Sequence, residues 1–207
     1  MTEPLHALCD LFASVQGEGE QTGRAMLFIR FWGCPLACPW CDEPRHRDPA
    51  CRFDWTAGRI HDRLQELGPG IPHILLTGGE PLVAPGLNDL VAFFKERDYW
   101  VALETSGVGG VPPPGLDWIT LSPKTRLSED WYRRADEIKY VLGPDPDPAA
   151  EAAIVERAAR HPRVRVQPRA AGNRPDPRAV RRCLELVMAH GARLRLSLQV
   201  HKWLGVP

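Results

Sequence analysis

Short apolar runs alternate along this chain with segments in which apolar residues recur every three or four positions. Apolar runs bounded by turn residues are typical of buried strands, and the longer period is typical of amphipathic helices. The runs predict strands at residues 26–31, 73–77, 99–105, 116–121, 137–142, 164–168 and 193–200. The longer period predicts helices around Ile60, Leu64 and Leu67, Leu87 to Phe94, residues 148–160, and Val180, Cys183, Leu184 and Val187.

Strands that alternate with helices predict a parallel sheet covered by helices, an α/β fold. The connection between Thr105 and Leu116 is rich in glycine and proline and too short to hold a helix. A complete (β/α)8 barrel takes about 250 residues, and this chain has 207. We therefore expect an open, partial (β/α) barrel that forms a single domain over residues 1–207.

Composition narrows the classes of partner and location. The chain is 43% hydrophobic and carries 26 basic and 26 acidic residues, so its formal net charge is zero. A neutral chain gives no general argument for nucleic acid or an acidic membrane as a partner. No apolar run is long enough to span a bilayer, and the N-terminus does not resemble a secretory signal. We expect a cytoplasmic protein, in a compartment where thiols stay reduced.

Three of the six cysteines, Cys34, Cys38 and Cys41, lie within eight residues. Six cysteines are too sparse for a disulfide scaffold in a chain of this length, so the spacing points to a metal. Three thiolates on one short loop can hold three corners of a [4Fe–4S] cluster. The fourth iron then stays open to a substrate, as the open position of a catalytic zinc does.

Other roles for the cysteines remain open. Cys51 could complete the cluster as a fourth ligand, which would give a closed electron-transfer site. His46 could complete a zinc site, although zinc usually takes four ligands and CxxxCxxC is not its common spacing. The three could also be core thiols. Cys9, Cys51 and Cys183 are more typical of small hydrophobic side chains.

The cysteine loop resembles that of the radical S-adenosylmethionine superfamily, CxxxCx(aromatic)C, with Trp40 in the aromatic place. A second shared motif, Thr77-Gly78-Gly79-Glu80-Pro81, follows a predicted strand, although alone it could be a plain turn. The resemblance implies a [4Fe–4S] cluster whose open iron binds the methionine end of S-adenosylmethionine. Reductive cleavage then gives a 5′-deoxyadenosyl radical. It also implies that the expected open, partial barrel is of the radical S-adenosylmethionine type.

Further motifs resemble, nearly end to end, the 7-carboxy-7-deazaguanine synthase family. They are Leu11 to Gly19 with its QGEG stretch, Arg30, Asp42 after the cysteines, Glu104 to Gly107, Ser122 to Lys124, Gln167-Pro168, and Gln199 to Lys202. The resemblance implies a carbon–nitrogen lyase that converts 6-carboxy-5,6,7,8-tetrahydropterin to 7-carboxy-7-deazaguanine and ammonia. This step serves the biosynthesis of queuosine and other 7-deazapurines. The family also implies a homodimer, and we expect a reductant such as flavodoxin.

The same resemblance assigns site residues. The residues expected at S-adenosylmethionine are Trp40, Gly79, Glu80, Glu104, Ser122, Pro123, Lys124, Gln167, Pro168, Arg169 and Ala170. The residues expected at the substrate are Val15, Gln16, Gly17, Glu18, Arg30, Thr77, His201 and Pro207. Among these, Arg30 can direct two parallel donors at the substrate carboxylate. Because the polar motifs follow strands, we expect them at the carboxyl ends of a parallel sheet.

Glu43 departs from the family, which has a threonine there that binds Mg2+ beside the substrate carboxylate. A carboxylate is a good ligand for Mg2+, so Glu43 could bind the metal directly. Alternatively, Glu43 could pair with Arg45 or Arg47 and need no metal, or its charge could repel the substrate. The sequence leaves the use of Mg2+ undecided.

Two other functions stay open. A glycyl-radical activating enzyme shares the cysteine loop and the GGEP motif but acts on a large protein. A non-catalytic zinc or iron–sulfur module is the second alternative. The QGEG stretch could be a hairpin turn, and His201, as a lone histidine, could be structural. The QGEG stretch and Arg30 suit a small bicyclic substrate and favour the pterin.

Overall fold

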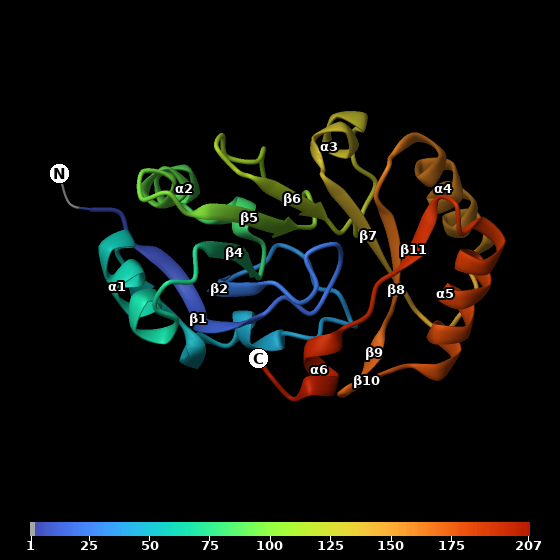
Figure 1. Ribbon diagram of the computed structural model, residues 1–207, viewed down its shortest axis with the longest axis horizontal. Helices are drawn as coiled ribbons and strands as arrows, with labels where there is room; N and C mark the ends of the chain where they lie inside the picture. Colours follow the sequence, from blue (N-terminus) through green and yellow to red (C-terminus); the bar gives the residue numbers. More distant parts are fainter. Residues whose placement is uncertain (1–2) are drawn as a thin grey trace. The chain divides into compact units, whose positions relative to one another are not determined.

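The computed structural model describes residues 3–207, which form two compact units (Figure 1). The first unit contains residues 3–15, residues 24–119 and Pro207, and the second contains residues 16–23 and 120–206. Each unit has its own parallel strands and its own helices. No helix within residues 3–207 is long and apolar enough to cross a membrane.

The sheet of the first unit has the strand order β5-β4-β2-β1-β3. Its strands are β1 (His6–Val15), β2 (Ala25–Phe31), β3 (Phe53–Trp55), β4 (His73–Gly78) and β5 (Trp100–Thr105). Strands β2, β4 and β5 are parallel, as the sequence predicts. Strand β1, which the hydrophobic pattern did not reveal, runs antiparallel to β2 and to β3.

Two helices cover one face of this sheet. They are α1 (Ala57–Leu67) beside β1 and α2 (Leu87–Lys95) beside β5 (Figure 1). Three 3-10 helices, η1 (Pro44–Arg47), η2 (Pro49–Cys51) and η3 (Pro81–Val83), lie in the loops. Because side chains alternate along a strand, Leu27, Ile29 and Phe31 of β2 pack against the helices. Phe28 packs on the opposite face, and Arg30 shares that face, with its guanidinium 5.1 Å from the ring centre of Phe12.

The second unit holds parallel strands in the order β11-β8-β7-β6. They are β6 (Trp118–Leu121, whose first two residues belong to the first unit), β7 (Glu137–Leu142), β8 (Val164–Pro168) and β11 (Leu194–Leu196). The helices are α3 (Glu129–Arg134), α4 (Pro148–Arg160), α5 (Pro177–His190) and α6 (Val200–Leu204). A short hairpin joins β9 (Ala170–Ala171) to β10 (Arg174–Pro175). Helices α4 and α5 lie beside β8 (Figure 1).

The predicted bounds of β7, α4 and β8 are confirmed, but the predicted last strand is wrong beyond Leu196. Val200 begins helix α6 instead, and its N–H donates to the carbonyl oxygen of Gly17 at 2.9 Å. The N–H of Ser197 still donates to Val166 O of β8 at 2.9 Å, and beyond Ser197 the chain leaves β8. The inward face predicted for α5 is also partly wrong, because Leu184 is 43% exposed while Cys183 is buried.

Candidate active site

The cysteine loop of the first unit directly follows β2. Cys34, Cys38 and Cys41 form no disulfide within residues 3–207 and are half-buried. The N–H of Cys41 donates to the carbonyl oxygen of Cys38 at 3.1 Å, which holds the second half of the loop in a tight turn. Burial raises the pKa of the Cys34 thiol, and a backbone hydrogen bond from Leu36 opposes that rise. Metal binding, which requires the thiolate, therefore has to release a proton from this residue.

These donors fit a [4Fe–4S] cluster held by three thiolates. Each thiolate of such a cluster binds a different iron, so the sulfur atoms need not converge on one point. Within residues 3–207, no three His, Cys, Asp or Glu side chains form a group that could hold a metal ion. Trp40, between the last two cysteines, is exposed, so its indole is accessible to a cofactor.

The GGEP motif lies against the segment that leads into the cysteine loop. The N–H of Gly79 donates to Phe31 O, and the N–H of Glu80 donates to Gly33 O, both at 2.9 Å. A Cβ atom on Gly79 would lie 1.8 Å from the carbonyl oxygen of Gly33. Gly79 therefore has no room for a side chain because its backbone packs against the segment that leads into the cysteine loop. Contact of Gly79 with S-adenosylmethionine stays a prediction.

Glu80 is a buried carboxylate, 1% exposed, that joins two loops of the first unit. Its Oε1 accepts hydrogen bonds from Leu82 N at 3.2 Å and Thr105 Oγ1 at 2.6 Å. Its Oε2 accepts from Ser106 N at 2.8 Å and from the Ser106 hydroxyl. Burial raises the pKa of Glu80, and these hydrogen bonds lower it. The structure thus gives Glu80 a positioning role beside its predicted contact with S-adenosylmethionine.

Four more predicted residues of this unit lie at or near the ends of strands. Thr77 of β4 is the register partner of Arg30 in β2. Glu104 is the half-buried penultimate residue of β5, and Val15 is the last residue of β1. The carbonyl oxygen of Pro207 accepts a hydrogen bond from Ser14 Oγ at 2.8 Å, which places Pro207 beside the end of β1.

The carboxylate of Glu43 is held by two arginines. Arg45 binds it in a fork, with Nε 2.8 Å from Oε1 and Nη2 2.8 Å from Oε2, and Arg30 Nη1 contacts Oε2. The alternative in which Glu43 pairs with Arg45 is confirmed, whereas Arg47 donates to Leu36 O at 2.7 Å. Mg2+ takes oxygen ligands, and guanidinium groups already occupy both oxygens of Glu43. As arranged, these residues do not fit a Mg2+ site at Glu43.

His46 and Cys51, the other possible ligands, lie in the 3-10 helices after the loop. His46 is buried, and its Nε2 lies 3.4 Å from Cys41 Sγ. Its Nδ1 has no hydrogen-bond partner in the part of the chain that the structure describes. The thiol of Cys51 is 3.8 Å from Asp48 Oδ2. His46 is therefore placed to donate a hydrogen bond to a cysteine of the loop.

In the second unit, the loop from Gln16 to Gly23 contains the QGEG stretch and packs against the segment before and within α6. Gly17 makes the closest approach, because a Cβ there would lie 2.1 Å from Nδ1 of His201. The N–H of Gly19 donates to Ser197 Oγ at 3.0 Å, and Ser197 in turn donates to Gln167 Oε1 at 2.6 Å. These contacts bring Gln16, Gly17, Glu18, Gln167 and His201 into one neighbourhood, while their contacts with substrate or cofactor stay predictions.

Buried charges in β7 and β8 hold this loop. Lys139 pairs with Glu18, and Glu18 also accepts from Gln199 Nε2 at 2.7 Å. Arg165 pairs with Glu20 and with Glu137, and the N–H of Glu20 donates to Glu137 Oε1 at 3.0 Å. Sequence reasoning missed Lys139, Arg165, Glu137 and Ser197. A charged residue at alternate positions of an otherwise apolar strand was the available signal.

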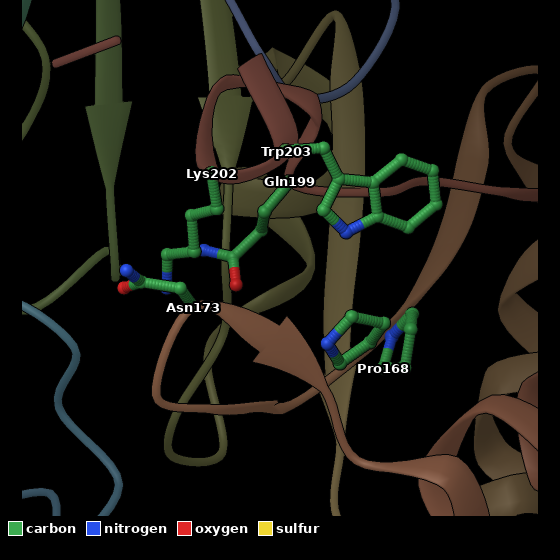
Figure 2. Close-up of a pocket in the computed structure, with 6 residues that line it drawn as sticks. Pro168, Asn173, Gln199, Lys202 and Trp203 are labelled. Carbon is green, nitrogen blue, oxygen red and sulfur yellow. The ribbon is translucent and has the colours of Figure 1, made fainter. Parts of the chain in front are cut away.

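The remaining predicted residues lie after β6 and β8. Lys124 Nζ donates to Ser122 Oγ at 2.8 Å across Pro123. Arg169 follows β8 and its N–H donates to Leu142 O at 2.9 Å, and Ala170 begins β9. Pro168 lines a pocket opposite Gln199 and the α6 residues Lys202 and Trp203, with Asn173 from the β9–β10 turn (Figure 2).

Comparison with known proteins decides the family. The model of the radical SAM superfamily matches residues 29–137. The 7-carboxy-7-deazaguanine synthase of Bordetella pertussis is 33% identical over 98% of this chain and 99% of its own length. The Escherichia coli synthase is 30% identical over 95% of this chain and 97% of its own. The chain belongs to the 7-carboxy-7-deazaguanine synthase family. The crystal structure of QueE from Escherichia coli matches with a TM-score of 0.77, at 27% identity over 94% of each chain.

Membership of this family confirms several predictions. The fold is the α/β, partial (β/α) barrel of radical SAM enzymes, and the enzyme is a radical SAM lyase of the queuosine pathway. Its cofactors are a [4Fe–4S] cluster and S-adenosylmethionine. Its substrate is a small molecule, and it requires a reductant.

Proposed function

We propose that this enzyme converts 6-carboxy-5,6,7,8-tetrahydropterin to 7-carboxy-7-deazaguanine with loss of ammonia. The observation that carries the proposal is the packing of Gly17 against His201, which brings the QGEG stretch and the motif from Gln199 to Lys202 together within the second unit. The names of the relatives support the same reaction.

The second unit offers groups that suit a pterin edge, which presents both donors and acceptors. Gln16 is buried, and its Oε1 accepts from Glu18 N at 3.1 Å, so the amide is held in a fixed orientation. A second buried amide, Gln167, is fixed by Ser197. We assign Gln16, Gly17, Glu18 and His201 of this unit to the pterin, together with Val15 of the first unit. Because the amides of Gln16 and Gln167 are already held by hydrogen bonds, binding has to order these two side chains little further.

The first unit offers the carboxylate site and the cofactor loop. Arg30 lies on the face of the sheet opposite α1 and α2, beside Thr77, and we assign both to the substrate. The cluster and S-adenosylmethionine, when bound, supply a radical able to remove a hydrogen atom from the substrate. Cys34, Cys38 and Cys41 would hold the cluster. The chain's own task is to hold the pterin in one orientation and to keep water away from it.

The S-adenosylmethionine contacts predicted for Trp40, Gly79, Glu80, Glu104, Ser122, Pro123, Lys124, Gln167, Pro168, Arg169 and Ala170 remain part of this proposal. So does a single radical SAM domain over residues 1–207, which the family match supports because it runs from β2 into β7. We also propose a homodimer and a cytoplasmic enzyme. Flavodoxin, or another acidic reductant, would dock beside the exposed Arg45 and Arg47 after the cysteine loop.

The test is anaerobic turnover of 6-carboxytetrahydropterin by the reconstituted enzyme with dithionite and S-adenosylmethionine. We expect 7-carboxy-7-deazaguanine in the products, and its absence would reject the proposed reaction. Cys34→Ala should remove cluster-dependent cleavage of S-adenosylmethionine. Cys51→Ala is the matched control and should retain both cluster and cleavage. Loss of the cluster in this control would show that Cys51 is a ligand.

A further inference from the structure

Glu43 contacts Arg30, the residue that we assign to the carboxylate of the substrate. Its carboxylate contacts Nη1 of Arg30 and also forms an ion pair with Arg45. The side chains of Arg30 and Glu43 are only 18% and 19% exposed, whereas that of Arg45 is 53% exposed. The less accessible contact in this group is therefore the one between Arg30 and Glu43.

We propose that Glu43 competes with the substrate carboxylate for Arg30, and that Arg45 is the counter-ion that retains Glu43 when the substrate binds, without Mg2+. The proposal rests on the proposed function, because it takes the carboxylated pterin as the ligand. In this arrangement a second arginine, Arg45, takes the role of the metal. When the substrate binds, its carboxylate replaces the carboxylate of Glu43 on Arg30.

The structure favours Arg45 as the group that keeps Glu43 after the exchange. Glu43 precedes η1 and accepts from Arg45 N at 3.3 Å as well as from the Arg45 guanidinium. The two residues are only two positions apart in sequence, so little chain entropy opposes their contact. Arg45 Nη2 is also 3.1 Å from Asp10 Oδ2, which anchors the guanidinium from a second side.

Arg30 has donor capacity that Glu43 does not use. Its Nε is buried and has no hydrogen-bond partner within residues 3–207. An unmet buried donor on a charged group is costly, and a ligand carboxylate would meet it. Burial lowers the pKa of Arg30, but a guanidinium stays protonated in proteins. Arg30 is therefore a cation whose burial favours an added anion.

A partly exposed ion pair contributes up to about 1 kcal/mol, so release of Arg30 from Glu43 should change ligand affinity by up to about fivefold. The probe is 6-carboxypterin, a stable carboxylated analogue, and the control ligand is pterin, which lacks the carboxylate. Their dissociation constants are measured on anaerobically reconstituted enzyme with S-adenosylmethionine, in Mg2+-free buffer and with added Mg2+.

We expect Glu43→Gln to bind 6-carboxypterin several-fold more tightly than wild type and pterin equally well. Arg45→Met should weaken the binding of 6-carboxypterin several-fold, and Arg45→Lys should weaken it less. In the double variant, Glu43→Gln should cancel the effect of Arg45→Met on this affinity. The matched control is Glu129→Gln, which removes the carboxylate that pairs with Arg157. It should leave the affinity for both ligands unchanged.

Added Mg2+ should not change the affinity of wild type by more than about twofold, whereas Glu43→Thr should gain Mg2+-dependent binding. Tighter wild-type binding with Mg2+, or weaker 6-carboxypterin binding by Glu43→Gln, would overturn the exchange. These are binding measurements, so they remain decisive if turnover fails. Failed turnover with selective 6-carboxypterin binding would reject only the proposed reaction.

Discussion

Lys139 provides the most direct test of how the second unit holds the QGEG loop. Its side chain is 4% exposed and pairs with Glu18, which is 14% exposed. The change Lys139→Met keeps the length of the apolar stem and removes the charge. Removing one partner of a buried ion pair costs about 3–5 kcal/mol, because the other charge is left buried. Glu18 keeps its hydrogen bond from Gln199 at 2.7 Å, so we expect the lower end, about 3 kcal/mol.

Such a loss is a large part of a stability that typically totals about 5–15 kcal/mol. Urea unfolding followed by circular dichroism measures it, with Arg133→Met as the control. Arg133 pairs with Asp130 at the surface, 70% and 68% exposed, so the control should change the free energy of unfolding by less than about 0.5 kcal/mol. The double variant Lys139→Met with Glu18→Gln should recover most of the loss. If Lys139→Met costs no more than the control, the buried pair does not support the loop.

Three further predictions concern the first unit. Gly79→Ala should prevent cluster assembly, because its Cβ would lie 1.8 Å from Gly33 O; full iron content after reconstitution would contradict this. Burial raises the pKa of Glu80 above its ordinary 4.5, so the folded protein holds this proton more tightly than the unfolded chain. The stability from this group is complete below about pH 4.5 and is lost as pH rises through the folded pKa. Urea titrations across this range should show that slope in wild type and not in Glu80→Gln. His46→Phe should lower the midpoint potential of the cluster, because a hydrogen bond to a ligand sulfur stabilises the reduced state, and His46→Gln should lower it less. An unchanged potential in a redox titration followed by electron paramagnetic resonance would exclude this contact.

The local pattern of the chain was sufficient to place most of the parallel strands and helices. Strand β7 at Glu137–Leu142 and helix α4 at Pro148–Arg160 have the predicted bounds, because apolar periodicity and flanking prolines act over a few residues. The hydrophobic pattern did not reveal β1, since its ten residues alternate only weakly between apolar and polar. Its pairing depends on β2 and β3, which lie elsewhere in the sequence.

The chemistry of this protein can be predicted from local motifs: three cysteines at a spacing that suits an open cluster, and stretches that match the 7-carboxy-7-deazaguanine synthase family. How those motifs are held depends on contacts between residues far apart in the chain. Lys139 reaches Glu18 across 121 positions of sequence, and no local pattern encodes such a partner. Glu43 showed its departure from the family in the sequence. Its contact with Arg30 as well as Arg45 could not be predicted from the sequence, because the strength of an ion pair depends on the distance between the charges in space.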